Sequence, residues 1–205
     1  MSGPGCGCEV EIKDQSEKKV LWILLGINAA MFVGEFIGGW LADSTGLIAD
    51  SLDMLADAGV YGISLYAVGR TLRHKASAAM VSGIFQIMLA FAVVGDVTRR
   101  FVVGSEPESG LMAGIALIAL IANLTCLILI SKHRKGEVHM RASWIFSAND
   151  VIANMGVIIA GGLVFLTGSR IPDLVIGFII SVVVLRGGIL IVRDARASFA
   201  KTECA

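Results

Sequence analysis

The chain has 205 residues, of which 56% are hydrophobic and 17% charged, and its 17 basic and 17 acidic residues give a formal net charge of zero. A soluble globular domain carries more charge, about a quarter of its residues, so water is not the main solvent of this chain. The zero net charge provides no basic field of the kind that binds nucleic acid. The composition therefore favours an integral membrane protein.

Six apolar segments lie between charged residues or turn signals, and each has about the 20 residues needed to cross the hydrocarbon core of a bilayer. We therefore predict an all-α polytopic membrane protein with six transmembrane helices. Its transport domain, residues 20–192, follows a cytoplasmic tail, residues 1–19, and precedes a short cytoplasmic tail, residues 193–205. The first segment is too long for a signal-peptide core and no cleavage site follows it, so we expect the mature protein to keep it. The predicted spans are residues 20–42, 47–69, 76–97, 111–130, 142–166 and 174–192.

The positions of Lys and Arg predict the orientation of the chain. With both termini in the cytoplasm, 13 of these residues fall in cytoplasmic segments and only three, Arg99, Arg100 and Arg170, in the outer loops. Positive charge is retained on the cytoplasmic side, so we predict cytoplasmic termini and location in the cell (inner) membrane. Arg186 lies inside the sixth span, where it either anchors the helix by reaching the interface or pairs with a buried carboxylate.

Five acidic residues fall inside the predicted spans, where a charged side chain costs about 2.5–3.5 kcal/mol and therefore indicates function. Asp53 and Asp57 are four residues apart, so their side chains lie on one face of the helix. Two like charges so close repel unless a proton or a cation lies between them. The pair predicts a divalent cation site, with a proton relay as the alternative. The five acids are Glu35, Asp50, Asp53, Asp57 and Asp150.

The second and fifth spans run in opposite directions, which places Asp150 at about the depth of Asp53 and Asp57. A site formed by these three acids would lie near the membrane midplane, where transporters bind their substrates. Asp50 is closer to the outer end and either lines an entrance or is structural. The alternative is that the acids merely pair with Arg186 or hydrogen-bond to the buried asparagines, which are Asn28, Asn123 and Asn154.

The segment from Ser44 to Asp57, STGLIADSLDMLAD, resembles the second-helix signature of the cation diffusion facilitator family. In that signature His, Asp or Asn is followed four residues later by Asp. The resemblance extends over nearly the whole chain, from the first span to the sixth. It implies a homodimer of six-helix protomers that exchanges a metal ion for protons by alternating access. Further matching positions in the first, fourth and fifth helices are Asn28, Glu35, Gly39, Asn123 and residues 141–150.

The chain departs from the family pattern at Phe146, where the fifth helix usually has a His four residues before its Asp. The implied metal ligands are then Asp53, Asp57 and Asp150. Water, Ser147 or Asn149 would complete the shell, although only Ser147 shares a helix face with Asp150. An oxygen-only site relaxes the preference for zinc towards manganese, iron or cobalt. Without the imidazole, proton coupling would depend on the carboxylates.

A second departure is that the chain stops soon after the sixth span, so we expect a short form without the family's soluble C-terminal metal-binding domain. Dimerisation would then depend on the membrane helices or the tails. A smaller mismatch is Val60, where the signature has Ala or Ser. Cys6 and Cys8 in the N-terminal tail could capture a soft metal ion, although two cysteines are also compatible with an inert tail.

These features predict an exporter of zinc or cadmium, with protons as counter-ion and no permanently bound cofactor. We do not expect an enzyme, because the sequence has no nucleophile and base pair and no glycine-rich phosphate loop. The alternatives are an exporter of manganese, iron or cobalt, a non-transporting membrane partner that has lost a ligand at Phe146, and a passive channel.

Overall fold

The structure is a computed structural model that describes residues 6–67, 72–131 and 138–203; some side chains within these ranges also lie outside the description. Over these ranges the chain is helical and has no strand. The predicted all-α fold with six helices is therefore confirmed. The helices are α1 (Cys6–Leu41), α2 (Thr45–Ala67), α3 (Leu72–Val103), α4 (Ser109–Ser131), α5 (Val138–Thr167) and α6 (Ile171–Glu203).

Five of the six helices, all except α2, are long and apolar enough to cross a membrane. The helix α2 has 23 residues, which corresponds to about 35 Å and is also sufficient to cross. What distinguishes α2 is its charge, because it carries Asp50 near its start and Asp53 and Asp57 towards its midpoint. The one helix that does not meet the criterion for a membrane span is thus the helix that carries most of the predicted site.

Several helices are longer than the predicted spans. The helix α1 begins at Cys6, α3 continues to Val103 and α6 continues to Glu203. Consequently Arg99 and Arg100, predicted in an outer loop, lie in the last turns of α3. The physical reason is that hydropathy marks where a helix leaves the apolar layer, whereas Lys, Arg and Glu are good helix formers and allow the helix to continue. The boundaries between the transport domain and the tails stay a prediction.

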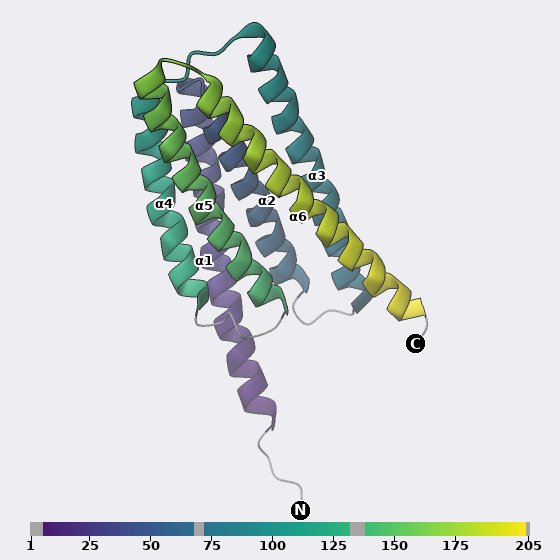
Figure 1. The fold of residues 1–205 in the computed structure, drawn as a ribbon. Helices are drawn as coiled ribbons and strands as arrows, with labels where there is room; N and C mark the ends of the chain where they lie inside the picture. The colour runs from purple at the N-terminus through teal and green to yellow at the C-terminus, as the bar shows by residue number, and fades with distance from the viewer. Residues whose placement is uncertain (1–5, 68–71, 132–137, 204–205) are drawn as a thin grey trace, which may run out of the picture.

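The helix α2 lies in the middle of the bundle, where it packs against α1, α3, α5 and α6. Figure 1 shows α3 and α6 beside one another and α4 beside α5. The connections at residues 42–44, 104–108 and 168–170 all lie at one end of the bundle, which we call the capped end. The helix α1 begins, and α6 ends, at the opposite end. The start of α1 and the end of α6 therefore lie on the same side, and the assignment of that side to the cytoplasm stays a prediction.

The distribution of polar and apolar side chains is the reverse of that in a water-soluble protein. Large apolar side chains cover the outside, among them Trp40, which is 74% exposed, and Phe165, which is 77% exposed. The interior instead contains fully buried Asn28 and Asn123. Such an apolar exterior requires a lipid environment. The bundle is an integral membrane protein with several transmembrane helices.

Glycines allow α3 and α6 to approach each other closely. A Cβ atom added at Gly83 would lie 3.0 Å from the carbonyl oxygen of Gly188, and one added at Gly188 would lie 3.0 Å from that of Gly83. Small residues at such crossings let two helix backbones come together in a membrane, where van der Waals packing drives helix association. The side chains next to this crossing on α3 are consequently held against α6.

At the capped end, Asp173 of α6 caps the first turn of α2. Its carboxylate accepts hydrogen bonds from the Ser44 hydroxyl at 2.7 Å, the Thr45 backbone N–H at 2.6 Å and the Gly46 backbone N–H at 2.9 Å. The Asp173 side chain is fully buried. The first N–H groups of a helix have no partner within the helix, so this one carboxylate satisfies them and joins the starts of α2 and α6.

Arg100 forms a second network at the capped end. Its guanidinium donates to the Asp96 carboxylate at 2.6 Å, to the Asp43 backbone oxygen at 2.7 Å and to the Asp43 carboxylate. Asp43 has a φ of 49°, a left-handed conformation that costs energy for a residue other than Gly. Arg100 is only 3% exposed, so it stabilises this turn as well as adding charge at the capped end.

Replacing Asp173 by Ala should destabilise the bundle, because it removes the acceptor of three buried hydrogen bonds. We expect a loss of about 1–3 kcal/mol and a fall of several degrees in the unfolding temperature of the detergent-solubilised protein. The control is Glu106→Ala, an acidic residue exposed at the capped end. Equal unfolding temperatures for Asp173→Ala and Glu106→Ala would show that the cap contributes nothing.

Candidate functional site

The four aspartates in the middle of α2 and α5 are all buried in the bundle. Asp50 is fully buried, Asp53 is 7% exposed, Asp57 is 1% exposed and Asp150 is 2% exposed. None of these side chains faces lipid, because α2 is surrounded by other helices and α5 turns Asp150 towards it. The predicted depth agrees with the helix bounds, since Asp57 lies near the midpoint of α2.

A small cavity of about 20 Å³ lies between four helices and is lined by the three predicted ligands. Its volume corresponds to about one water molecule. The helix α2 contributes two acids and α5 contributes one, so the structure brings these residues to a single place, as the antiparallel arrangement predicts. The lining residues are Asp53 and Asp57 of α2, Gln86 of α3, Asn149 and Asp150 of α5, and Val183, Val184 and Gly187 of α6.

The acids share this cavity without forming a closed ligand cage. Among the described side chains, no three His, Cys, Asp or Glu residues are close enough to hold a metal ion in their present positions. The cavity is also too small for a metal ion with its full shell of water. An ion could therefore occupy it only with its water largely removed and with the carboxylates drawn inward.

Tyr61 connects Asp57 to Ser147 behind the cavity. The Tyr61 hydroxyl donates to Oδ2 of Asp57 at 3.3 Å and lies 3.4 Å from the Ser147 hydroxyl. Ser147, predicted as an additional ligand from its position relative to Asp150, thus interacts with Tyr61, whereas Asn149 lines the cavity. The spacing of Ser147 and Asn149 from Asp150 along α5 favoured Ser147 as a ligand. This spacing does not indicate where α6 lies, and α6 forms one wall of the cavity.

Glu35 of α1 and Asp50 of α2 form a second acidic group next to the cavity. Both side chains are fully buried and lie within interaction distance of each other. Two carboxylates only accept hydrogen bonds, and none of their four oxygens has a donor among the described residues. Asp50 does not line the cavity with Asp53 and Asp57, but belongs to this neighbouring pair.

The interior asparagines do not neutralise the acids. Asn28 donates to the backbone oxygen of Leu24 at 2.9 Å, and Asn154 donates to the backbone oxygen of Asp150 at 2.8 Å. Neither side-chain atom of Asn123 has a partner in the described part of the chain. Arg186 is exposed on α6 and is no buried counter-ion either. The interpretation that these groups satisfy the acids is therefore wrong for the described residues.

Three side chains that entered the predictions are outside the described part of the structure. They belong to Cys6, Cys8 and Phe146.

Two residues with clear roles in the structure were not predicted from the sequence. Gln86 lines the cavity, and its polar side chain inside an apolar segment was a visible signal. Asp173 gave no comparable signal, because an acid after Pro172 is typical of any helix start.

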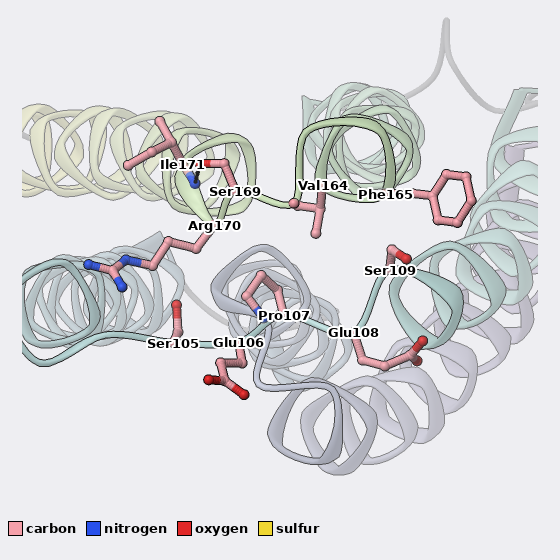
Figure 2. Close-up of a pocket in the computed structure, with 11 residues that line it drawn as sticks. Ser105, Glu106, Pro107, Glu108, Ser109, Val164, Phe165, Ser169, Arg170 and Ile171 are labelled. Atoms are coloured by element: carbon pink, nitrogen blue, oxygen red, sulfur yellow. Dashed lines mark hydrogen bonds between the residues drawn. The ribbon is translucent and has the colours of Figure 1, made fainter.

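A larger and open pocket of about 930 Å³ lies at the capped end, between residues 105–109 and the turn from α5 to α6. Figure 2 shows Glu106, Pro107 and Glu108 on one side and Ser169 and Arg170 on the other. The Glu108 carboxylate accepts from the Gly110 and Leu111 backbone N–H groups and so caps α4. Glu108 thus serves to cap a helix at the edge of this pocket. The pocket is separate from the buried acids.

Helices that cross a membrane around a central group of buried acids define a membrane transport protein whose substrate is positively charged. The comparison with protein families gives the same class. Residues 21–200 match the cation efflux transmembrane domain. The chain therefore belongs to the cation efflux family, as the resemblance in its second helix implied, and it is a transporter-family protein and not an enzyme.

Curated relatives are identical to this chain at about a quarter of the aligned positions. The zinc transporter ZitB of Escherichia coli is 27% identical over 198 residues, covering 89% of this chain and 62% of ZitB. A cadmium, cobalt and zinc/H(+)-K(+) antiporter of Bacillus subtilis is 24% identical over 194 residues, covering 88% and 62%. A zinc transporter of Caenorhabditis elegans, ttm-1, is 25% identical over 214 residues, covering 89% and 52%. The chain thus spans less than two thirds of the length of these relatives.

Replacing Asp50 by Asn should stabilise the protein in the absence of metal, because the new amide can donate a hydrogen bond to the Glu35 carboxylate. We expect a gain of about 1 kcal/mol, or about 2–4 °C in unfolding temperature in detergent at neutral pH. The reciprocal change, Glu35→Gln, should act in the same direction. A lower unfolding temperature in both variants would instead show that the two carboxyl groups hold a proton or a cation between them.

Proposed function

We propose that this protein exports a divalent metal cation from the cytoplasm, with zinc or cadmium as the cargo and protons as the counter-ion. The observation that carries this proposal is the cavity in the middle of the bundle, which is lined by Asp53, Asp57 and Asp150. Family membership supports efflux of a cation, and the names of the relatives in Escherichia coli and Bacillus subtilis support zinc and cadmium.

The three carboxylates supply the charge that a divalent ion needs in an apolar environment. Burying them without compensation is costly, because each negative charge has lost its water and repels the other two. A doubly positive ion between them offsets most of this cost. Since the cavity holds about one water molecule, the ion would exchange its hydration water for carboxylate oxygens.

The same carboxylates can hold protons after the metal ion has left, and this gives a physical basis for exchange. Metal and protons compete for one set of oxygens, so entry of protons from the outer side favours release of the metal there. No imidazole takes part in this competition, because the residue four positions before Asp150 is Phe146. Coupling then depends on Asp53, Asp57 and Asp150 alone.

Further parts of the proposal follow from the family. We expect a homodimer in the cell (inner) membrane, with the ends of α1 and α6 on the cytoplasmic side and Asn149 or water completing the metal shell. An oxygen-only site also suits manganese, iron or cobalt, and the missing imidazole at Phe146 favours this second candidate. A non-transporting membrane partner is the outcome to be expected if the acids bind no metal.

Asp57→Asn and Asp150→Asn should each reduce metal transport at least tenfold, because each removes one of three charges that hold the ion. The measurement is uptake of zinc, cadmium, cobalt, manganese and iron into proteoliposomes with an acidic lumen, so that outward proton flow drives uptake. Collapsing the pH gradient with an ionophore should slow the wild type. The matched control is Asp194→Asn, exposed on α6, which should transport like wild type.

Two results would contradict the proposal. Wild-type rates in Asp57→Asn and Asp150→Asn would show that the cavity is not the transport site. A wild-type protein that is folded and correctly reconstituted, but moves none of the five metals, would favour the non-transporting partner. Uptake that ignores the pH gradient would leave metal transport in place and reject only the exchange for protons.

Phe146→His should restore an imidazole one helical turn before Asp150 and shift selectivity towards zinc. An imidazole nitrogen binds zinc more favourably than manganese, so we expect the ratio of zinc to manganese affinity to rise at least tenfold. Competition binding to the purified protein measures this ratio. Phe146→Leu serves as the control for loss of the ring, and an equal ratio in the two variants would place residue 146 away from the metal.

A further inference from the structure

We propose that Gln86 of α3 is a ligand of the transported cation and supplies a neutral oxygen from the α3 and α6 side of the cavity. This inference rests on the proposed function and adds a fourth oxygen donor to Asp53, Asp57 and Asp150. Gln86 lies outside the second and fifth helices. With Gln86 included, the proposed site consists only of oxygen donors, which come from α2, α3 and α5.

The first observation is the position of the Gln86 side chain. It is only 2% exposed, and it lines the same cavity of about 20 Å³ as the three carboxylates. Its Oε1 atom has no hydrogen-bond partner among the described residues. Leaving a buried carbonyl oxygen without a partner costs about 1–3 kcal/mol, whereas Leu or Met would fill the space without this cost. A buried acceptor without a partner, in a residue that lines an acidic cavity, is suited to a cation.

The second observation is that the α3–α6 crossing holds the Gln86 amide in place. Gly83 and Gly188 bring the two backbones together one turn away. A Cβ atom at Gly187 would lie 3.4 Å from Nε2 and 3.8 Å from Oε1 of Gln86. Gly187 also lines the cavity, and these distances are ordinary van der Waals contacts, so the Gln86 amide packs against α6 at this position. The donor is therefore oriented by packing before any ion arrives.

The charge of the site explains why a neutral donor is suitable there. Three carboxylates and one divalent ion leave a net charge of about −1, and a fourth carboxylate would increase it further. An amide oxygen adds a ligand without adding charge, and it is typical of sites for hard cations. The Gln86 oxygen thus also bears on selectivity, because it favours manganese over cadmium in comparison with a sulfur or nitrogen donor.

Gln86→Cys tests contact with the metal directly. A thiolate bound to Co²⁺ produces a charge-transfer absorption band in the near ultraviolet, and a thiol elsewhere does not. We expect this band when Co²⁺ is added to the purified Gln86→Cys protein in detergent, measured as the difference from wild type so that the native cysteines cancel. The control is Ser82→Cys, which is buried on α3 one turn earlier and does not line the cavity.

The band should also disappear when Asp57→Asn is added to Gln86→Cys, because both residues would hold the same ion. Absence of the band, in a Gln86→Cys protein that binds Co²⁺ through Asp57, would overturn the inference and leave the proposed function intact. Wild-type protein that binds no Co²⁺, Zn²⁺ or Mn²⁺ would reject both. A band of equal strength in Ser82→Cys would show that the signal is not specific to the cavity, and would count against Gln86.

Gln86→Met gives a second test that keeps the size of the side chain and does not depend on a cysteine. It replaces a hard oxygen by a soft thioether sulfur. We expect the affinity for Mn²⁺ to fall at least fivefold, while that for Cd²⁺ changes less, as measured by competition binding. Equal losses for the two ions, or none, would mean that Gln86 only shapes the helix crossing and does not touch the metal.

Discussion

The central constraint on this protein is that α2 carries three aspartates through the middle of a membrane bundle. Charged side chains are tolerated there only when they face protein or a polar cavity. The structure meets this requirement by surrounding α2 with α1, α3, α5 and α6. The outer helices can then be apolar towards lipid, and Asp53, Asp57 and Asp150 can share a cavity between four helices.

The capped end of α2 and the part of α2 around the buried acids are held in different ways, and this bears on how a transporter could move. At the capped end, Asp173 fixes the first turn of α2 to α6 through three hydrogen bonds, and Arg100 fixes the preceding turn to α3. In the middle, by contrast, buried oxygens of Asp50, Gln86 and Asp150 have no partner among the described residues. The polar contacts that resist movement are thus concentrated away from the site.

Hydropathy and charge were sufficient to predict six helices and the three acids of the cavity, because apolar length and buried carboxylates are local properties of the sequence. The ends of α1, α3 and α6 could not be predicted in this way, since helices continue beyond the apolar layer. The choice between Ser147 and Asn149 as a residue of the cavity also could not be predicted from the sequence. Their spacing from Asp150 favoured Ser147, but the position of α6, a property of the tertiary structure, places Asn149 at the cavity.

Gln86 illustrates what only the assembled bundle provides. In the sequence it is one polar residue within an apolar segment, and any face of α3 could have carried it. The close approach of α3 and α6 at Gly83 and Gly188 turns this face of α3 towards α6, and the Gln86 amide packs against α6 at Gly187. The acids supply the charge for binding a cation, whereas neutral donors such as the Gln86 amide adjust the hardness and number of ligands. With Gln86 as the proposed ligand, we expect the preference among divalent metals to depend on the packing of α3 against α6 as well as on the second-helix signature.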